Sequence, residues 1–174
     1  FSSSATNDTF TNNNIEGYYE FGNYTYYGNQ NYFANCDIDS GYAGYYTNYT
    51  FYEANGKYAN NVWGKYGSYY CYFYYANQME YLGNDVGSPS SNYYYTFFYY
   101  GTALNIHNNN FFGLDYGLAV EYPNYSSRTA PYLVYNNFCS GYYDYGLYVY
   151  TSYSGDMNTH FLHNTIYSNN YYAL

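Results

Sequence analysis

Two short patterns recur together along the chain, and this repetition constrains the fold more than any other feature. In the first, an apolar or aromatic residue, or once His, is followed three positions later by Asn, and in the second a small or polar residue precedes Tyr-Tyr or Tyr-Gly. The Asn copies are Asn35, Asn61, Asn84, Asn110, Asn137 and Asn164, and the first Tyr copies are Tyr18, Tyr45, Tyr69, Tyr93, Tyr116, Tyr145 and Tyr171. Because each Asn copy is followed by one Tyr copy, the order indicates a true repeat of about 25 residues.

A repeat of this length is typical of a solenoid, and its content decides which kind. Aromatic and β-branched runs at residues 69–73, 93–100 and 147–150 favour strands, and Gly and Asn interrupt the chain too often for helices. We therefore expect an all-β parallel β-helix of about seven coils over residues 15–174. Residues 1–14 are expected to form an irregular arm or a partial first coil. Residues 121–133, which hold two of the three prolines, are expected to form a protruding loop.

Three stretches carry a family resemblance: residues 108–120, residues 136–149 and residues 163–174, with Asn-Asn-Phe, Asp-Tyr-Gly-Leu and His-Asn-Thr-Ile among their motifs. They resemble the repeats of the pectate-lyase-like parallel β-helix superfamily. The resemblance implies a right-handed β-helix. It does not choose a function, because that superfamily includes lyases, glycosidases, phage tailspikes, adhesins and surface proteins.

Both recurring patterns have a physical reason to stack. An Asn at a turn tolerates a left-handed backbone and can bond its side-chain amide to the copy in the next coil, so we expect an asparagine ladder. The Tyr copies are expected to form a stacking ladder, in which offset rings contribute about 0.5 to 1.5 kcal/mol per pair. Both ladders would fix the register between coils.

The supply of aliphatic residues is small, since Val, Ile and Leu together number 17 while Tyr and Phe number 38 and 12. We expect aromatic rings to fill much of the core, and each buried Tyr hydroxyl to need a partner. Cys36, Cys71 and Cys139 lack metal-site spacing. Buried free thiols are expected, with a Cys36–Cys71 disulfide as the alternative.

The scarcity of basic residues argues against several classes of partner. Lys57, Lys65 and Arg128 are the only basic residues besides His, against 12 acidic ones, and the net charge is −9. Nucleic acid and anionic lipid are therefore not expected as partners, and no apolar run is long enough to span a membrane. The composition favours an extracellular or cell-surface setting. Sequons at Asn7, Asn23, Asn48 and Asn124 are candidate glycosylation sites, of which Asn124 is favoured because it lies on the Pro-flanked loop.

The strongest catalytic candidate is the pair Asp115 and Asp144, which occupy equivalent repeat positions and could act as a glycosidase pair. Gly, Ser and Asn fill the same slot in other coils, so a turn role is preferred. His160 and His163, with His107, raise a metal site, but residues three apart on a strand point to opposite faces. We therefore predict no enzyme activity, no catalytic or metal site, and no cofactor.

A lone β-helix must protect the strand edges at its ends, and no capping helix is expected here. No Lys or Arg falls in residues 1–56 or 129–174. We expect the chain to be a structural subunit of an extracellular filament, sheath or surface layer, assembling head to tail with itself. An adhesin or carbohydrate-binding module, which would use exposed aromatic residues to stack on glycans, is the first alternative. A glycoside hydrolase or polysaccharide lyase is the second.

Overall fold

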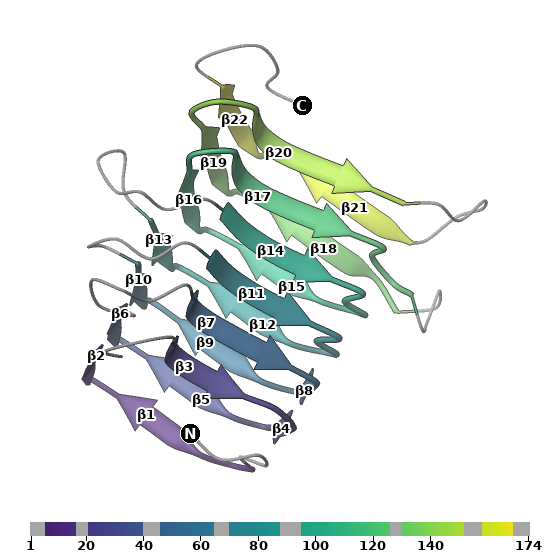
Figure 1. Ribbon diagram of the computed structural model, residues 1–174. Helices are drawn as coiled ribbons and strands as arrows, with labels where there is room; N and C mark the ends of the chain where they lie inside the picture. Colours follow the sequence, from purple (N-terminus) through teal and green to yellow (C-terminus); the bar gives the residue numbers. More distant parts are fainter. Residues whose placement is uncertain are drawn as a thin grey trace.

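The computed structural model is a parallel β-solenoid, and it describes residues 6–16, 21–39, 46–64, 70–87, 95–125, 130–151 and 158–168. Three long sheets run along its axis, and no helix occurs within these ranges. The coils stack from β1 at one end to β22 at the other (Figure 1). In the described part of the chain the three sheets hold seven, seven and six strands, and every neighbouring pair in them is parallel.

Sheet I and sheet II supply two of the long faces. In stacking order, sheet I consists of β1 (Thr9–Thr11), β5 (Tyr32–Ala34), β9 (Lys57–Ala59), β12 (Glu80–Leu82), β15 (Asn105–His107), β18 (Tyr132–Tyr135) and β21 (Thr159–Leu162). Sheet II consists of β2 (Asn14–Glu16), β6 (Asp37–Asp39), β10 (Val62–Trp63), β13 (Asp85–Val86), β16 (Asn110–Gly113), β19 (Phe138–Gly141) and β22 (Thr165–Ser168).

Sheet III supplies the third face. It consists of β3 (Phe21–Thr25), β7 (Tyr46–Phe51), β11 (Tyr70–Tyr74), β14 (Tyr95–Tyr99), β17 (Tyr116–Glu121) and β20 (Tyr145–Tyr150). Two short strands, β4 (Gly28–Asn29) and β8 (Glu53–Ala54), pair at the corner that follows sheet III. Strand β11 shows why these segments are strands: Cys71 and Phe73 point inward while Tyr70, Tyr72 and Tyr74 lie on the outer side, a period of two.

The core is a set of columns, each built from one residue per coil. The sheet I column is Phe10, Phe33, Tyr58, Tyr81, Ile106, Val134 and Phe161. The sheet II column is Ile15, Ile38, Trp63, Val86, Phe111, Cys139 and Ile166. Among the described residues, eight of the eleven largest fully buried side chains are aromatic, so the expectation that rings fill much of the core is confirmed.

The turn between sheet I and sheet II places one residue per coil in the left-handed region. These residues are Asn12, Asn35, Asn60, Gly83, Asn108, Asn136 and His163, with φ between 53° and 62°. Asn adopts this region more readily than most residues, which explains its recurrence there. At Gly83 an added Cβ would also lie 2.3 Å from Asn60 Oδ1.

The predicted fold class is confirmed as an all-β parallel solenoid, with fewer complete three-sheet turns than the seven expected. Its right-handed winding stays a prediction. Strand β1 pairs with β5, so residues 9–11 belong to the first coil rather than to an irregular arm. The predicted loop at 121–133 is shorter than expected, because Glu121 ends β17 and Tyr132 begins β18. Cys36, Cys71 and Cys139 are buried free thiols, so the disulfide alternative is wrong.

Candidate functional site

A column of buried asparagines links successive coils at the turn between sheets I and II. Asn61, Asn84, Asn109 and Asn137 are each at most 2% exposed, and Asn164 at the end of the column is half-buried. In each step the Oδ1 atom of one Asn accepts hydrogen bonds from the backbone N–H and the Nδ2 of the Asn one coil earlier, at 2.8–3.1 Å. The Nδ2 group of each Asn also donates a hydrogen bond to a backbone carbonyl oxygen of the preceding coil.

Two members of the predicted asparagine ladder are wrong. Asn35 and Asn110 lie one residue away from the column, whose members at those coils are Cys36 and Asn109. Asn35 instead occupies the left-handed turn position, and Asn110 begins β16 with an exposed side chain. The expectation gave one residue both roles, whereas the structure divides them between neighbours: one residue takes the left-handed backbone and the next makes the ladder.

The predicted tyrosine ladder is described only at Tyr116 and Tyr145. These residues are paired in register, and their ring centroids lie 5.7 Å apart at 20°. The five other predicted members lie outside the described residues: Tyr18, Tyr45, Tyr69, Tyr93 and Tyr171.

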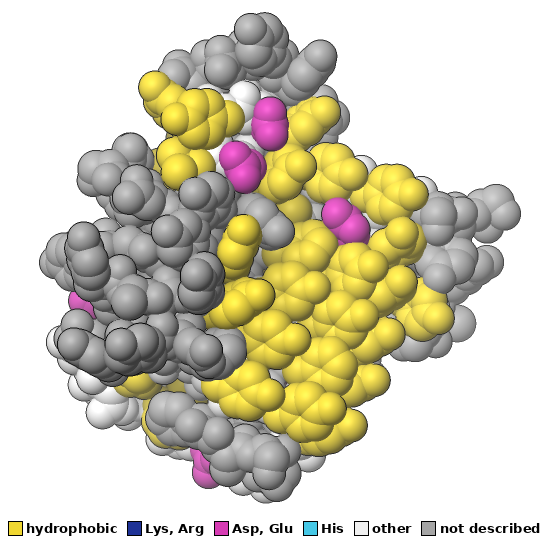
Figure 2. Space-filling view, viewed as in Figure 1, with side chains coloured by type: hydrophobic (Ala, Val, Ile, Leu, Met, Phe, Trp, Pro, Cys, Tyr) yellow, Lys and Arg dark blue, Asp and Glu magenta, His cyan; other side chains and the backbone are white. Residues whose placement is uncertain are grey.

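A longer aromatic array lies at the corner after sheet III. The tyrosine column consists of Tyr27, Tyr52, Tyr75, Tyr100 and Tyr122, with centroids 4.8–5.2 Å apart and planes within 17°. Beside it, the mixed column consists of Tyr26, Phe51, Tyr74 and Tyr99. Rings of the two columns in the same coil meet edge to face at 4.2–4.7 Å. Together these columns form the aromatic corner, part of the continuous yellow field in Figure 2.

The aromatic corner has its own sequence pattern, which differs from the Tyr motif used to predict the repeat. Two consecutive aromatic residues precede one further residue in four successive coils, as in Tyr26-Tyr27-Gly28 and Tyr99-Tyr100-Gly101. None of the residues in the predicted tyrosine ladder belongs to this corner. The inner rings of the tyrosine column have a stacked ring on both faces, so the outer surface there presents ring edges and hydroxyls rather than faces.

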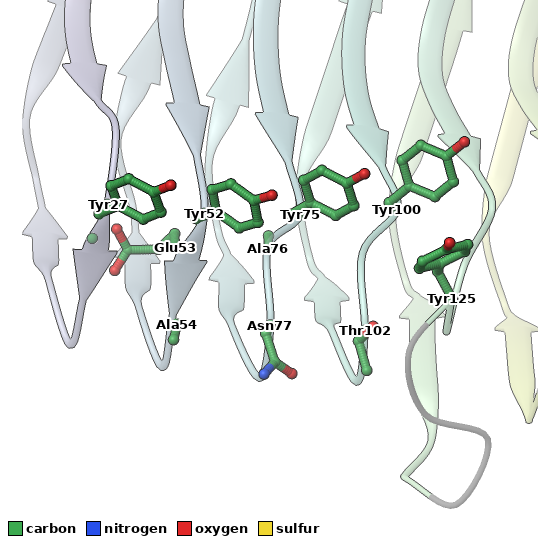
Figure 3. A pocket seen from close by; sticks show the side chains of 11 residues that line it. Tyr27, Tyr52, Glu53, Ala54, Tyr75, Ala76, Asn77, Tyr100, Thr102 and Tyr125 are labelled. Carbon is green, nitrogen blue, oxygen red and sulfur yellow. The ribbon is translucent and has the colours of Figure 1, made fainter. Parts of the chain in front are cut away.

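A groove of about 460 Å³ runs beside the tyrosine column across several coils (Figure 3). Its most unusual residue is Glu53, which is 1% exposed. Asn31 donates from its backbone N–H to Oε1 at 3.3 Å and from Nδ2 to Oε2 at 3.0 Å. Burial outweighs these two bonds and raises the pKa of Glu53 from 4.5 to about 7. The small residues Gly28 and Gly56 leave room for this side chain.

Asp115 and Asp144, the catalytic alternative, lie in adjacent coils, where the Asp144 N–H donates to the Asp115 carbonyl at 3.3 Å. Burial, and secondarily the nearby charge of Asp144, raises the pKa of Asp115. The carboxylates are therefore neighbours, as their repeat positions predict. Asp144 is exposed.

The histidines occupy separate environments. His107 stacks on Tyr135 at 4.8 Å and lies 3.5 Å from Glu80, which also pairs with Lys57 at 2.8 Å. His160 contacts Asn158, and His163 takes the left-handed turn position. No group of three or more potential metal ligands occurs in the part of the chain that the structure describes.

Three of the four sequons are buried. Asn23, Asn48 and Asn124 are at most 1% exposed, and their amides bond within the protein. Asn124, the favoured site, accepts from the backbone N–H of Ala103 and donates to the carbonyl of Ala130. A glycan at any of these three residues is incompatible with this fold. Asn7 is exposed and stays a candidate.

The core columns become partly exposed at both ends of the described stack. Val120 is fully buried, whereas Val149, which pairs with it one coil later, is 37% exposed. Val149 lines an apolar hollow of about 430 Å³ together with Leu147 and Phe161. At the other end Ile15 is partly buried, although its partner Ile38 is fully buried.

Comparison of the chain with protein-family models, with curated proteins and with solved structures finds no match. The pectate-lyase-like resemblance therefore has no independent support beyond the solenoid fold. Within the described ranges, no helix is long and apolar enough to cross a membrane.

Proposed function

We propose that the protein is a structural subunit of an extracellular filament, sheath or surface layer, in which copies stack end to end. One observation carries the proposal: the core columns run the whole described length and reach both ends partly exposed. Val149, Phe161 and Ile166 lie at one end, and Phe10 and Ile15 lie at the other. Burying these residues against a second copy would be favourable by about 25 cal/mol per Å² of apolar surface.

The asparagine column supports a head-to-tail arrangement. Each step donates from the earlier coil to the Oδ1 of the later coil, so the column has a direction. At Asn164 the backbone N–H would meet an Oδ1 supplied by a following copy, and Asn13 occupies the corresponding position in the first coil. A contact between unlike ends does not close on itself and grows a filament.

Electron microscopy of the purified chain tests this proposal, and Val149→Arg is the variant that tests the interface. A charge placed in the apolar hollow would have to be buried on stacking, which is strongly unfavourable. We expect filaments from the unmodified chain and separate particles from Val149→Arg. Asn110→Arg adds the same charge at an exposed position in the middle of the stack and should still form filaments. Separate particles from the unmodified chain at high concentration would contradict the proposal.

A second candidate function is glycan binding by a cell-surface module, and the groove beside the tyrosine column is the observation that favours it. The hydroxyls of Tyr27 and Tyr52, which are 51% and 38% exposed, and the exposed side chain of Asn77 line this groove and could hydrogen-bond an extended polymer. Calorimetric titration with a panel of neutral oligosaccharides tests this candidate, with Tyr52→Ala as the groove variant. Saturable binding that Tyr52→Ala abolishes would favour it over filament formation.

A catalytic role is the remaining alternative, and we propose that Asp115 and Asp144 act in the turn rather than in chemistry. Asp144 is exposed, and the backbone hydrogen bond from Asp144 to Asp115 links the turns of two adjacent coils. Glycosidase turnover that is lost in Asp115→Asn or Asp144→Asn would overturn this assignment.

A further inference from the structure

The fold of the aromatic corner holds phenol rings in contact with one another. Tyr75 illustrates this: its ring lies 4.8 Å from Tyr52, 5.2 Å from Tyr100 and, edge to face, 4.4 Å from Tyr74. The exposed ends of the network are Tyr27, which is 51% exposed, and Tyr125, which is 48% exposed and meets Tyr100 edge to face. The network is therefore accessible from solvent and continuous through the coils.

The hydroxyls of the two columns are also linked. Tyr74 is hydrogen-bonded to Tyr75, and Tyr99 is hydrogen-bonded to Tyr100. Burial and then this bond raise the pKa of Tyr74 to about 12. Oxidation of a phenol removes a proton together with an electron, so a neighbouring hydroxyl that accepts a hydrogen bond provides the first proton acceptor.

We propose that the aromatic corner is a site of oxidative tyrosine modification, in which a one-electron oxidant generates tyrosyl radicals that couple to dityrosine within one chain. The oxidant class is a haem peroxidase with hydrogen peroxide. Each of two phenols loses one electron and one proton, and the two radicals join through the ring carbons ortho to oxygen. The ortho hydrogens then move to the oxygens, and the peroxide leaves as two water molecules.

Geometry explains why coupling occurs within the chain. Neighbouring rings are held in contact, so the second radical partner is present at a high effective concentration. A radical in the tyrosine column also has a ring partner in each adjacent coil, as Tyr52 and Tyr100 flank Tyr75. Tyr142 and Tyr143 provide the comparison, because they are 51% and 50% exposed and contact each other at 4.9 Å.

The test uses the Val149→Arg background, so that its outcome is independent of filament formation. The protein is treated at low concentration with haem peroxidase and hydrogen peroxide, and dityrosine is located by peptide mass spectrometry. We expect roughly two- to tenfold more coupling in the aromatic corner than at Tyr142 and Tyr143, because more ring partners are held in contact there. Coupling that follows exposure alone, or that joins separate chains, would overturn the proposal.

Two phenylalanine variants complete the test. Tyr75→Phe keeps the ring and removes one central phenol, and it should lower the dityrosine yield of the corner by roughly half or more. Tyr143→Phe removes a phenol of similar exposure outside the corner, and it should leave the yield of the corner unchanged. An unchanged corner yield in Tyr75→Phe would show that the columns do not act as one network.

Discussion

At the scale of single residues, the asparagine column explains why the amide must fall at one position and not at its neighbour. Asn109 accepts two hydrogen bonds from Asn84 and donates to Asn137 and to the Tyr81 carbonyl, all in a buried setting. Asn110 makes an exposed hydrogen bond to Asp85. Buried polar groups that lose their partners are costly, whereas exposed groups bond to water instead.

We therefore predict that Asn109→Ala lowers the free energy of unfolding by about 3 kcal/mol or more. Asn110→Ala, the matched control, should change it by about 0.5 kcal/mol or less. Urea unfolding followed by circular dichroism measures both. Equal effects, or a larger effect at Asn110, would show that the column is registered differently.

Glu53 predicts how stability depends on pH. Its folded pKa of about 7 lies above its ordinary value of 4.5, so the folded state binds the proton more tightly than the unfolded state. Its contribution to stability is fully present below about pH 4.5 and is lost as pH rises through 7, by about 3 kcal/mol in total. Glu53→Gln should remove this loss, so the two proteins should differ more in stability at pH 8 than at pH 4. A constant difference across that range would contradict the burial of the carboxyl.

The buried hydroxyl of Tyr132 departs from the expectation that each buried Tyr hydroxyl has a hydrogen-bond partner. Its side chain is fully buried, and its oxygen has no hydrogen-bond partner among the residues that the structure describes, which costs about 1–3 kcal/mol. Tyr132→Phe should therefore unfold at a temperature equal to or higher than that of the unmodified protein. Tyr81→Phe is the control, since its hydroxyl contacts the Cys71 sulfur at 4.0 Å, and it should give no such gain. Clear destabilisation by Tyr132→Phe would mean that the hydroxyl is bonded.

At the scale of the elements, the turn between sheets I and II depends on its left-handed residue. Gly83 holds this position in its coil, and Asn holds it in most others. We predict that Gly83→Val is less stable than Gly83→Asn by about 2 kcal/mol, because a β-branched residue is strained at positive φ. Thermal unfolding of the two variants measures the difference. Equal melting temperatures would contradict the left-handed assignment.

The sequence predicted the coil length and strand content well, because the spacing of Asn61, Asn84, Asn137 and Asn164 follows from one turn per coil. The register within the turn could not be predicted, since consecutive asparagines such as Asn108 and Asn109 are alike in sequence and differ only in backbone conformation. The aromatic corner was missed because Tyr is so frequent that several alignments compete. The burial of Glu53 had no sequence signal, because Gly28, Ala76 and Gly101 follow the tyrosine column in other coils.

At the scale of the whole molecule, the solenoid is a one-dimensional stack in which each coil contacts mainly its neighbours. Columns of core residues, asparagines and tyrosines all repeat along the same axis. The proposed end-to-end assembly would extend these columns, because the last described coil would offer to a second copy the same kinds of contact that each inner coil makes with the next. The strands would then lie across the filament axis.

X-ray fibre diffraction from aligned filaments tests this account most directly. Continued stacking of coils predicts a reflection at about 4.8 Å along the filament axis, from strands paired in that direction. Filaments made by side-to-side contact of the solenoids would instead place the same reflection across the axis, and that result would contradict end-to-end assembly.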